Sequence, residues 1–163
     1  MAEPPKAAGI LSPPEAGAKP ADKPYRYGFK QNGRFSVDNL LVEGSLQGVV
    51  EFNPQLQATF RTIPTESIQA TEAIVDDDMR RQRSAKYVLN ELTIAQLYYG
   101  LVAINGKDIP AGKPKYDPKD ESDPRHLFIR KLPGAMFDLL VEGLNEFEDR
   151  CKRLLRGEAL RNF

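Results

Sequence analysis

Residues 136–155 read MFDLLVEGLNEFEDRCKRLL and carry the clearest structural signal of the chain. Apolar side chains recur there at spacings of three, four, three, four and three residues: Phe137, Leu140, Leu144, Phe147, Cys151 and Leu154. This spacing predicts a helix with one apolar seam, which starts after the Pro133-Gly134 break and ends near Arg156. Because Cys151 lies in the seam, we expect it to behave as a small buried hydrophobe of low reactivity.

The seam has two possible uses, and the sequence leaves both open. It can pack inside the chain on the long helix predicted before it, which is the interpretation we prefer. It can also serve self-association or bind a helix of a partner protein.

That earlier helix is predicted over residues 84–104. Two adjacent apolar stripes cover a broad arc of it: Val88, Leu92, Ala95, Tyr99 and Val102, and next to them Ile94, Leu97, Leu101 and Ile104. An arc this broad indicates a central helix with neighbours on more than one side. We expect Asn105-Gly106 to end the helix with a left-handed glycine, and Tyr98 and Tyr99 to pack in or beside the core.

Another helix is predicted to begin at Pro64, with Thr62 as a candidate cap. One of its faces carries Ile68, Thr71, Val75 and Met79. The acidic residues 76–78 precede Arg80 and Arg81, which gives ion pairs at i,i+4 spacing. These carboxylates are not expected to hold Mg²⁺, because consecutive helical side chains point about 100° apart.

Residues 25–63 have the texture of short strands. Tyr25, Tyr27 and Phe29 alternate with polar residues, and Asn32-Gly33 predicts a hairpin in which residues 35–37 return. A second strand pair is predicted at 49–52 and 58–63, joined by a turn at 53–55. The predicted fold class is therefore α+β, mainly α, with a small antiparallel N-terminal sheet packed on three to four helices.

Domain organisation follows from composition. Residues 1–24 contain six of the 13 prolines and few large apolar side chains, so they are predicted to be a disordered leader. A flexible arm that docks on a partner is the alternative for this segment. Residues 25–157 are predicted to form a single interaction domain, and residues 158–163 a frayed tail.

The composition of the 163 residues excludes several classes of protein. A single cysteine and a single histidine allow neither an internal disulfide nor a Cys/His zinc site. With 23 basic and 23 acidic residues, the chain has no net attraction to nucleic acid or an anionic membrane. The sequence has no signal-peptide pattern and no run of about 18 apolar residues, and a lone thiol fits a reducing cytoplasm.

No catalytic motif is present: the sequence lacks a glycine-rich phosphate loop, a G-x-S-x-G elbow and an H-E-x-x-H helix. The polar loop of residues 107–123 is expected to be functional or flexible. Asp123 and Pro124 are predicted to cap and open a short helix. His126, without a nucleophile pattern, is expected to be a surface or packing residue. We predict no catalytic residue, no cofactor and no metal, and hence no enzyme.

Three pieces of sequence carry a resemblance to a known family. They are FRTIPTE (60–66), where a strand leads into a helix; LTIA (92–95) with LVAINGK (101–107); and LPGAMFD (132–138) leading into FEDR (147–150). The region from about Val50 to Leu155 resembles the tail assembly chaperones of tailed bacteriophages, or related baseplate assembly proteins. Such proteins similarly join a strand-rich start to a helical body, with a helix that ends in an Ile-Asn-Gly turn.

The resemblance implies a non-enzymatic protein without a cofactor that acts in the cytoplasm of the infected host. It would coat or guide the tape-measure protein, or prime a baseplate hub subunit, and could form homo-oligomers. The partner-binding residues expected on the two apolar helices are Leu92, Tyr99, Val102, Phe137, Leu140, Leu144, Phe147 and Leu154.

Two alternatives accompany this prediction. One is a minor structural protein of the baseplate or tail that stays in the virion. The other, less favoured, is a small nucleic-acid-binding regulator that would combine basic residues with strand aromatics: Arg80, Arg81, Arg83 and Lys86 with Tyr25, Tyr27 and Phe29.

Overall fold

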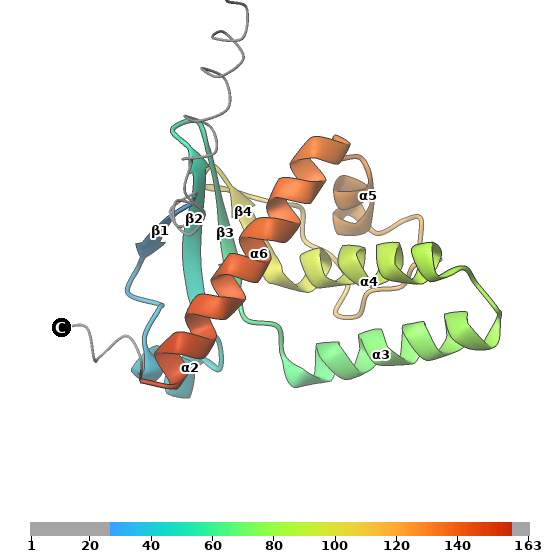
Figure 1. The fold of residues 1–163 in the computed structure, drawn as a ribbon, viewed down its shortest axis with the longest axis horizontal. Coiled ribbons are helices and arrows are strands. Elements are labelled where there is room, and N and C mark those ends of the chain that lie inside the picture. Colours follow the sequence, from blue (N-terminus) through green and yellow to red (C-terminus); the bar gives the residue numbers. More distant parts are fainter. Residues whose placement is uncertain (1–26, 158–163) are drawn as a thin grey trace, which may run out of the picture.

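The computed structural model describes residues 27–157, so the predicted leader (1–24) and tail (158–163) lie outside the described residues. In chain order the described residues form β1 (Gly28–Gln31), α2 (Val37–Glu43), β2 (Gln47–Asn53), β3 (Leu56–Arg61), α3 (Thr65–Arg80), α4 (Ala85–Gly100), β4 (Leu101–Ile104), β5 (Lys107–Asp108), α5 (Pro124–Arg130) and α6 (Gly134–Leu155). Helix α6 crosses one face of the sheet, and α3 and α4 extend away from it (Figure 1). The predicted α+β class with a majority of helix is confirmed.

The sheet has five antiparallel strands in the order β1-β2-β3-β4-β5. The predicted pairing of β2 with β3 is confirmed, and Asn53 Oδ1 accepts a hydrogen bond from Gln55 N (2.8 Å) in the turn between them. The sheet is not confined to the N-terminal part, since β4 and β5 come from the middle of the chain. Residues 101–104, predicted as the end of a long helix, pair instead with β3, so that prediction is wrong.

The predicted roles of the two Asn-Gly pairs, a helix end at residues 105–106 and a hairpin at residues 32–33, are wrong. Asn105 (φ 51°) and Gly106 (φ 76°) are both left-handed and form the two-residue turn between β4 and β5. The Asn105 side chain also holds the neighbouring turn, because Oδ1 accepts from Gln57 N (2.9 Å) and Nδ2 donates to the Gln55 carbonyl (3.0 Å). Asn32-Gly33 forms a turn that leads into α2, so no strand returns at residues 35–37.

Two helix caps also differ between prediction and structure. Ser36 Oγ accepts from Asn39 N (3.1 Å) and caps α2, a helix that the sequence reading missed. Thr62 does not cap α3, whose N-cap residue is Pro64; its hydroxyl instead accepts a hydrogen bond from Leu46 N (3.0 Å). Asp123 caps α5 as predicted, accepting from Arg125 N and His126 N.

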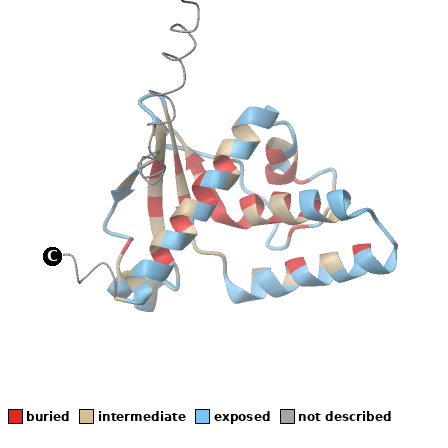
Figure 2. Cartoon of the chain, in the orientation of Figure 1, coloured by how far each residue is buried: buried red, intermediate tan, exposed pale blue. Residues whose placement is uncertain are grey.

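The core lies between α6, the sheet and α4 (Figure 2). Phe147 of α6 is fully buried, and its ring stacks on Phe60 of β3 with the centroids 6.2 Å apart. At Gly143 of the same helix, an added Cβ would lie 2.4 Å from the Phe52 ring, so only glycine allows this approach of helix and sheet. The predicted seam therefore packs mainly on β2 and β3, with α4 beside it, rather than on α4 alone.

Helix α3 ends in a Schellman motif that leads into α4. Gln82 N donates to the Met79 carbonyl (3.0 Å), and Arg83 N donates to the Asp78 carbonyl (3.1 Å). This arrangement requires a left-handed residue at Gln82, whose φ is 55°. A residue with a Cβ is strained in this conformation, and glycine is not.

We expect Gln82→Gly to raise the free energy of unfolding by roughly 0.5–1 kcal/mol, because relief of the left-handed strain exceeds the extra entropy of the unfolded glycine. Urea unfolding followed by circular dichroism measures the change. The control Gln82→Ala keeps the strain and should change stability by less than about 0.5 kcal/mol. A destabilising Gln82→Gly would contradict the assignment of this turn.

A second prediction concerns Cys151, which is buried in the core. Burial, with a smaller contribution from Glu148, raises the pKa of the thiol to about 12. The thiol should therefore react with an aromatic disulfide reagent only when the domain opens. We expect labelling in native buffer at least a hundredfold slower than in about 6 M guanidinium chloride, and slower still in Gln82→Gly. Rapid labelling of the native protein would show that the α6 seam is not closed.

Candidate interaction groove

The eight predicted partner-binding residues fall into two groups in the structure. Four are buried in the core: Tyr99, Leu140, Leu144 and Phe147. Four are half-buried: Leu92, Val102, Phe137 and Leu154. In the α6 seam, the side chains of Leu140, Leu144 and Phe147 are covered by the rest of the chain. For these three residues the structure agrees with the interpretation preferred above, in which the seam packs inside the chain. A partner-binding role for these three would require the domain to open.

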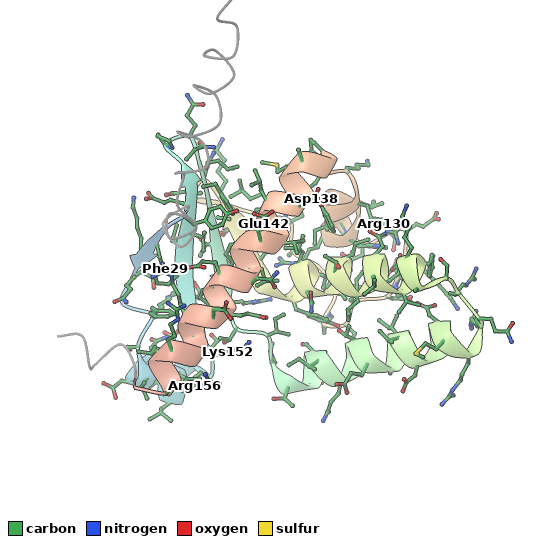
Figure 3. All side chains as sticks on the ribbon, viewed as in Figure 1. Phe29, Arg130, Asp138, Glu142, Lys152 and Arg156 are labelled. Carbon is green, nitrogen blue, oxygen red and sulfur yellow. The ribbon has the colours of Figure 1, made fainter. Side chains whose placement is uncertain are left out.

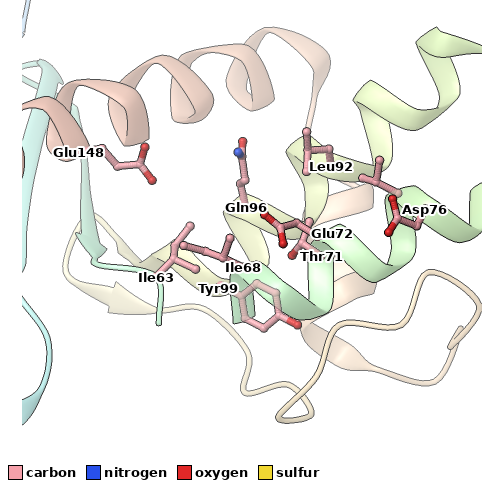
Figure 4. A pocket seen from close by; sticks show the side chains of 10 residues that line it. Ile63, Ile68, Thr71, Glu72, Asp76, Leu92, Gln96, Tyr99 and Glu148 are labelled. Atoms are coloured by element: carbon pink, nitrogen blue, oxygen red, sulfur yellow. The ribbon is translucent and has the colours of Figure 1, made fainter. Parts of the chain in front are cut away.

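Leu92 and Tyr99, by contrast, line a surface groove of about 470 Å³ (Figure 4). Helix α4 forms its floor, α3 forms one wall, and Glu148 of α6 lies on the other side. The lining residues are Ile63, Ile68, Thr71, Glu72, Val75, Asp76, Leu92, Gln96, Tyr99 and Glu148.

The groove stays open because α3 is attached mainly through α4. Only Thr71 and Asp78 of α3 are buried, and the Ile68 side chain keeps 46% of its surface exposed. The Thr71 hydroxyl donates to the Ser67 carbonyl (2.9 Å), so its hydrogen-bonding capacity is used inside the helix. The apolar surface that α3 contributes to the groove therefore comes from Ile68 and Val75.

The charges along the groove have one sign. Glu72 and Asp76 on α3 and Glu148 on α6 are carboxylates, and the lining residues include no lysine, arginine or histidine. Burial raises the pKa of Glu148; Lys152 acts against this rise, and Asp149 adds to it. The groove thus combines apolar side chains with a negative rim.

On the far side of α4, a polar network fixes the loop of residues 109–123. Glu91 is buried and accepts hydrogen bonds from the Tyr116 hydroxyl and from Arg130 Nη2, both at 2.7 Å. Arg130 Nε donates to His126 Nε2 (2.6 Å), which places the ring proton of a neutral His126 on Nδ1, 3.0 Å from the Asp120 carbonyl. Burial and the neighbouring Glu91 raise the pKa of Tyr116.

A second part of the network centres on Asp123. The Tyr98 hydroxyl (2.6 Å) and Lys113 N (3.2 Å) donate to its Oδ2, while Oδ1 caps α5. Burial raises the pKa of this carboxyl, but the hydrogen bonds from Tyr98 and the backbone outweigh burial and lower it overall. Burial and Asp123 raise the pKa of the Tyr98 hydroxyl.

This network is closed: its buried groups bond one another and backbone atoms. Of the two roles expected for His126, surface or packing, its burial excludes the surface one, and its hydrogen bonds could not be inferred from the sequence. Within residues 27–157, no group of three or more His, Cys, Asp or Glu side chains is arranged to hold a metal ion. The helices in this range are also too short or too polar to cross a membrane.

Sequence reasoning missed one further apolar surface, on α2. Leu41 and Val42 are 78% and 84% exposed, and Val37 and Leu155 are partly exposed as well. The prediction of a returning strand at residues 35–37 hides this surface, because in the structure α2 begins at Val37. Ser36 followed by Asp38 was the available signal for a capped helix.

Among the described residues, the basic and aromatic side chains of the nucleic-acid alternative do not come together. Arg80, Arg81 and Arg83 lie at the α3–α4 turn, whereas β1 is at the opposite end of the molecule (Figure 1). On β1, Phe29 packs edge-on against Phe35 (centroids 4.9 Å apart), and the Arg150 guanidinium covers its ring at 4.7 Å. Figure 3 shows Phe29 on the α6 side of the sheet.

Comparisons of the chain with models of protein families, with characterised proteins and with solved structures gave no match. The function is therefore argued from the groove and from the residues that form it.

The Asp123 junction yields a stability prediction. Asp123→Asn keeps an oxygen for the α5 cap but can turn an NH₂ group toward the Lys113 N–H, which then has no acceptor. We expect the free energy of unfolding at pH 7 to fall by about 1–3 kcal/mol. The exposed neighbour Glu121→Gln is the control and should leave stability nearly unchanged.

The same pair of variants tests the pKa of Asp123. Because folding lowers this pKa, the ionised carboxylate stabilises the fold above the unfolded-state pKa near 4, and this contribution is lost as pH falls through the folded-state pKa. The stability difference between wild type and Asp123→Asn should therefore shrink as the pH falls below about 4, where the unfolded carboxyl is already protonated, through the lowered folded-state pKa. Urea unfolding at several pH values measures it, and a constant difference would contradict the assignment.

Proposed function

We propose that this chain is a non-enzymatic protein-binding domain and that the groove between α3, α4 and α6 is its contact surface. One observation carries the proposal: Ile68, Val75 and Leu92 present apolar surface to solvent in a shaped groove of about 470 Å³. The main buried cluster of titratable groups, around Glu91 and Asp123, makes its hydrogen bonds within the described residues.

The energetics suit reversible capture. Full burial of one leucine or isoleucine side chain contributes about 1.5–3 kcal/mol. The groove residues are already partly covered, so each contributes less, and ordering of the partner opposes binding. The net affinity of such a groove permits release of the partner, as an assembly factor requires.

The more specific proposal is a tail assembly chaperone that binds the tape-measure protein or a baseplate hub subunit in the cytoplasm of an infected host. The support is the resemblance of residues 60–66, 132–138 and 147–150, together with the open groove. The Ile104-Asn105-Gly106 portion supports it less, because these residues end a strand and form a hairpin turn rather than the end of a helix.

Co-expression with the tape-measure and hub proteins of the same genome tests the proposal. We expect one of them to co-purify with the chain, and Ile68→Gln to reduce recovery at least fivefold because it places a polar amide in the apolar wall. The control Met79→Gln alters an exposed residue of the same helix outside the groove and should not reduce recovery. Equal recovery with Ile68→Gln would contradict the groove as the contact surface.

A lasting structural role in the tail or baseplate is the second candidate. It is favoured by the exposed Leu41 and Val42 on α2, which offer a second apolar contact of the kind that a subunit in a permanent assembly buries. Mass spectrometry of purified virions separates the two functions. The chain should be absent from mature particles if it is a chaperone and present in fixed stoichiometry if it is a structural subunit.

A further inference from the structure

We infer that the groove selects an amphipathic helix that carries a lysine or arginine next to its apolar face. This inference rests on the proposed function, because it specifies the chemistry of the partner that the same groove binds. It is argued from the length of the groove, its apolar residues and the sign of its charges.

The length fits a short helical segment. Ile68 and Asp76 mark the groove along α3, and eight residues of helix span about 12 Å. About two turns of a partner helix cover that distance. Such a helix would direct side chains at i, i+3 or i+4, and i+7 toward the floor, which is the usual mode of helix-in-groove recognition.

The apolar contacts come from several elements. Ile63 precedes α3, Ile68 and Val75 lie on α3, and Leu92 lies on α4, so a bound helix would touch more than one part of the chain. These positions would receive the apolar side chains of the partner. They do not by themselves distinguish a cationic partner from an anionic one.

The carboxylates make that distinction. Glu148 approaches from α6, while Glu72 and Asp76 line α3 (Figure 4). No basic side chain lines the groove, and an anionic partner would meet repulsion there. Cations beside the partner's apolar face would be attracted to these carboxylates, and one next to Glu148 would offset the burial that disfavours its ionised form.

Three synthetic 18-residue amphipathic peptides with one leucine face test this inference. They are identical except that the residues flanking that face are lysine, glutamine or glutamate. Fluorescence anisotropy with the full-length chain should give a Kd for the lysine peptide at least tenfold below that for the glutamate peptide in about 50 mM salt. The ratio should narrow at about 500 mM salt, where charges are screened.

Two triple variants with the same change in net charge localise the effect. Glu72→Gln/Asp76→Asn/Glu148→Gln should reduce the preference for lysine to less than about threefold. The control Asp38→Asn/Asp108→Asn/Glu121→Gln removes three exposed carboxylates outside the groove and should preserve the preference. An equal loss in both variants would attribute the preference to overall charge and overturn the inference.

The remaining outcomes separate this inference from the proposed function. If all three peptides bind equally well and Ile68→Gln weakens each, the groove binds helices without charge selection, and only the inference fails. If none binds, both the inference and the groove as a helix-binding surface fail.

Two other occupants would also overturn the inference. A second copy in the groove would appear as a dimer in light scattering that Ile68→Gln dissociates. The N-terminal segment of the same chain would be revealed by a spin label on Leu11→Cys that broadens the Ile68 and Leu92 methyl signals without peptide. Because the Cys151 thiol is buried, the spin label should attach only at position 11.

Discussion

The contact between Phe147 and Phe60 joins α6, the last helix of the described residues, to the sheet, and much of the architecture depends on it. Both rings are fully buried, and Phe35, which lies just before α2, packs against Phe147 with the ring centroids 6.1 Å apart. Without α6, the inner side chains of β2 and β3 would face water, and a small sheet of this kind needs a packed face to be stable. The position of α6 also sets the groove, because it places Glu148 opposite α3.

The parts of the fold that the sequence predicted correctly are those specified by local signals. The spacing of apolar residues in α6, the cap and proline at Asp123-Pro124, and the turn between β2 and β3 each depend on neighbouring residues. Residues 101–104 were misassigned because they continue the apolar stripes of α4, and periodicity cannot separate a short apolar strand from the end of a helix. Pairing with β3, over forty residues earlier, decides their conformation. The two Asn-Gly pairs show the same limit: Asn105 and Gly106 are left-handed and form a hairpin turn, whereas Asn32 and Gly33 have no positive φ and lead into α2.

The candidate site was partly predictable. The apolar stripe on α4 identifies Leu92 and Tyr99, but it does not reveal that both line a groove in which Leu92 is half-buried and Tyr99 buried. The spacing of apolar residues reveals the α6 seam. It does not reveal which surface covers the seam, because that surface is formed by the pairing of strands distant in sequence. In the sequence, Glu72, Asp76 and Glu148 look like ordinary solvated charges. Only the packing of α3 and α6 around α4 makes all three line the same groove.

Helix α4 passes into β4 without an intervening loop, and Arg61 Nε donates to the Tyr99 carbonyl at this junction (2.9 Å). The floor of the groove is thus continuous with the sheet, and the α6 wall is fixed to the same sheet by Phe147. Among the described elements, the main packing contact of α3 is with α4. In the proposed contact surface, the width beside α3 is therefore set mainly by helix–helix packing, whereas the position of Glu148 is set by the attachment of α6 to the sheet.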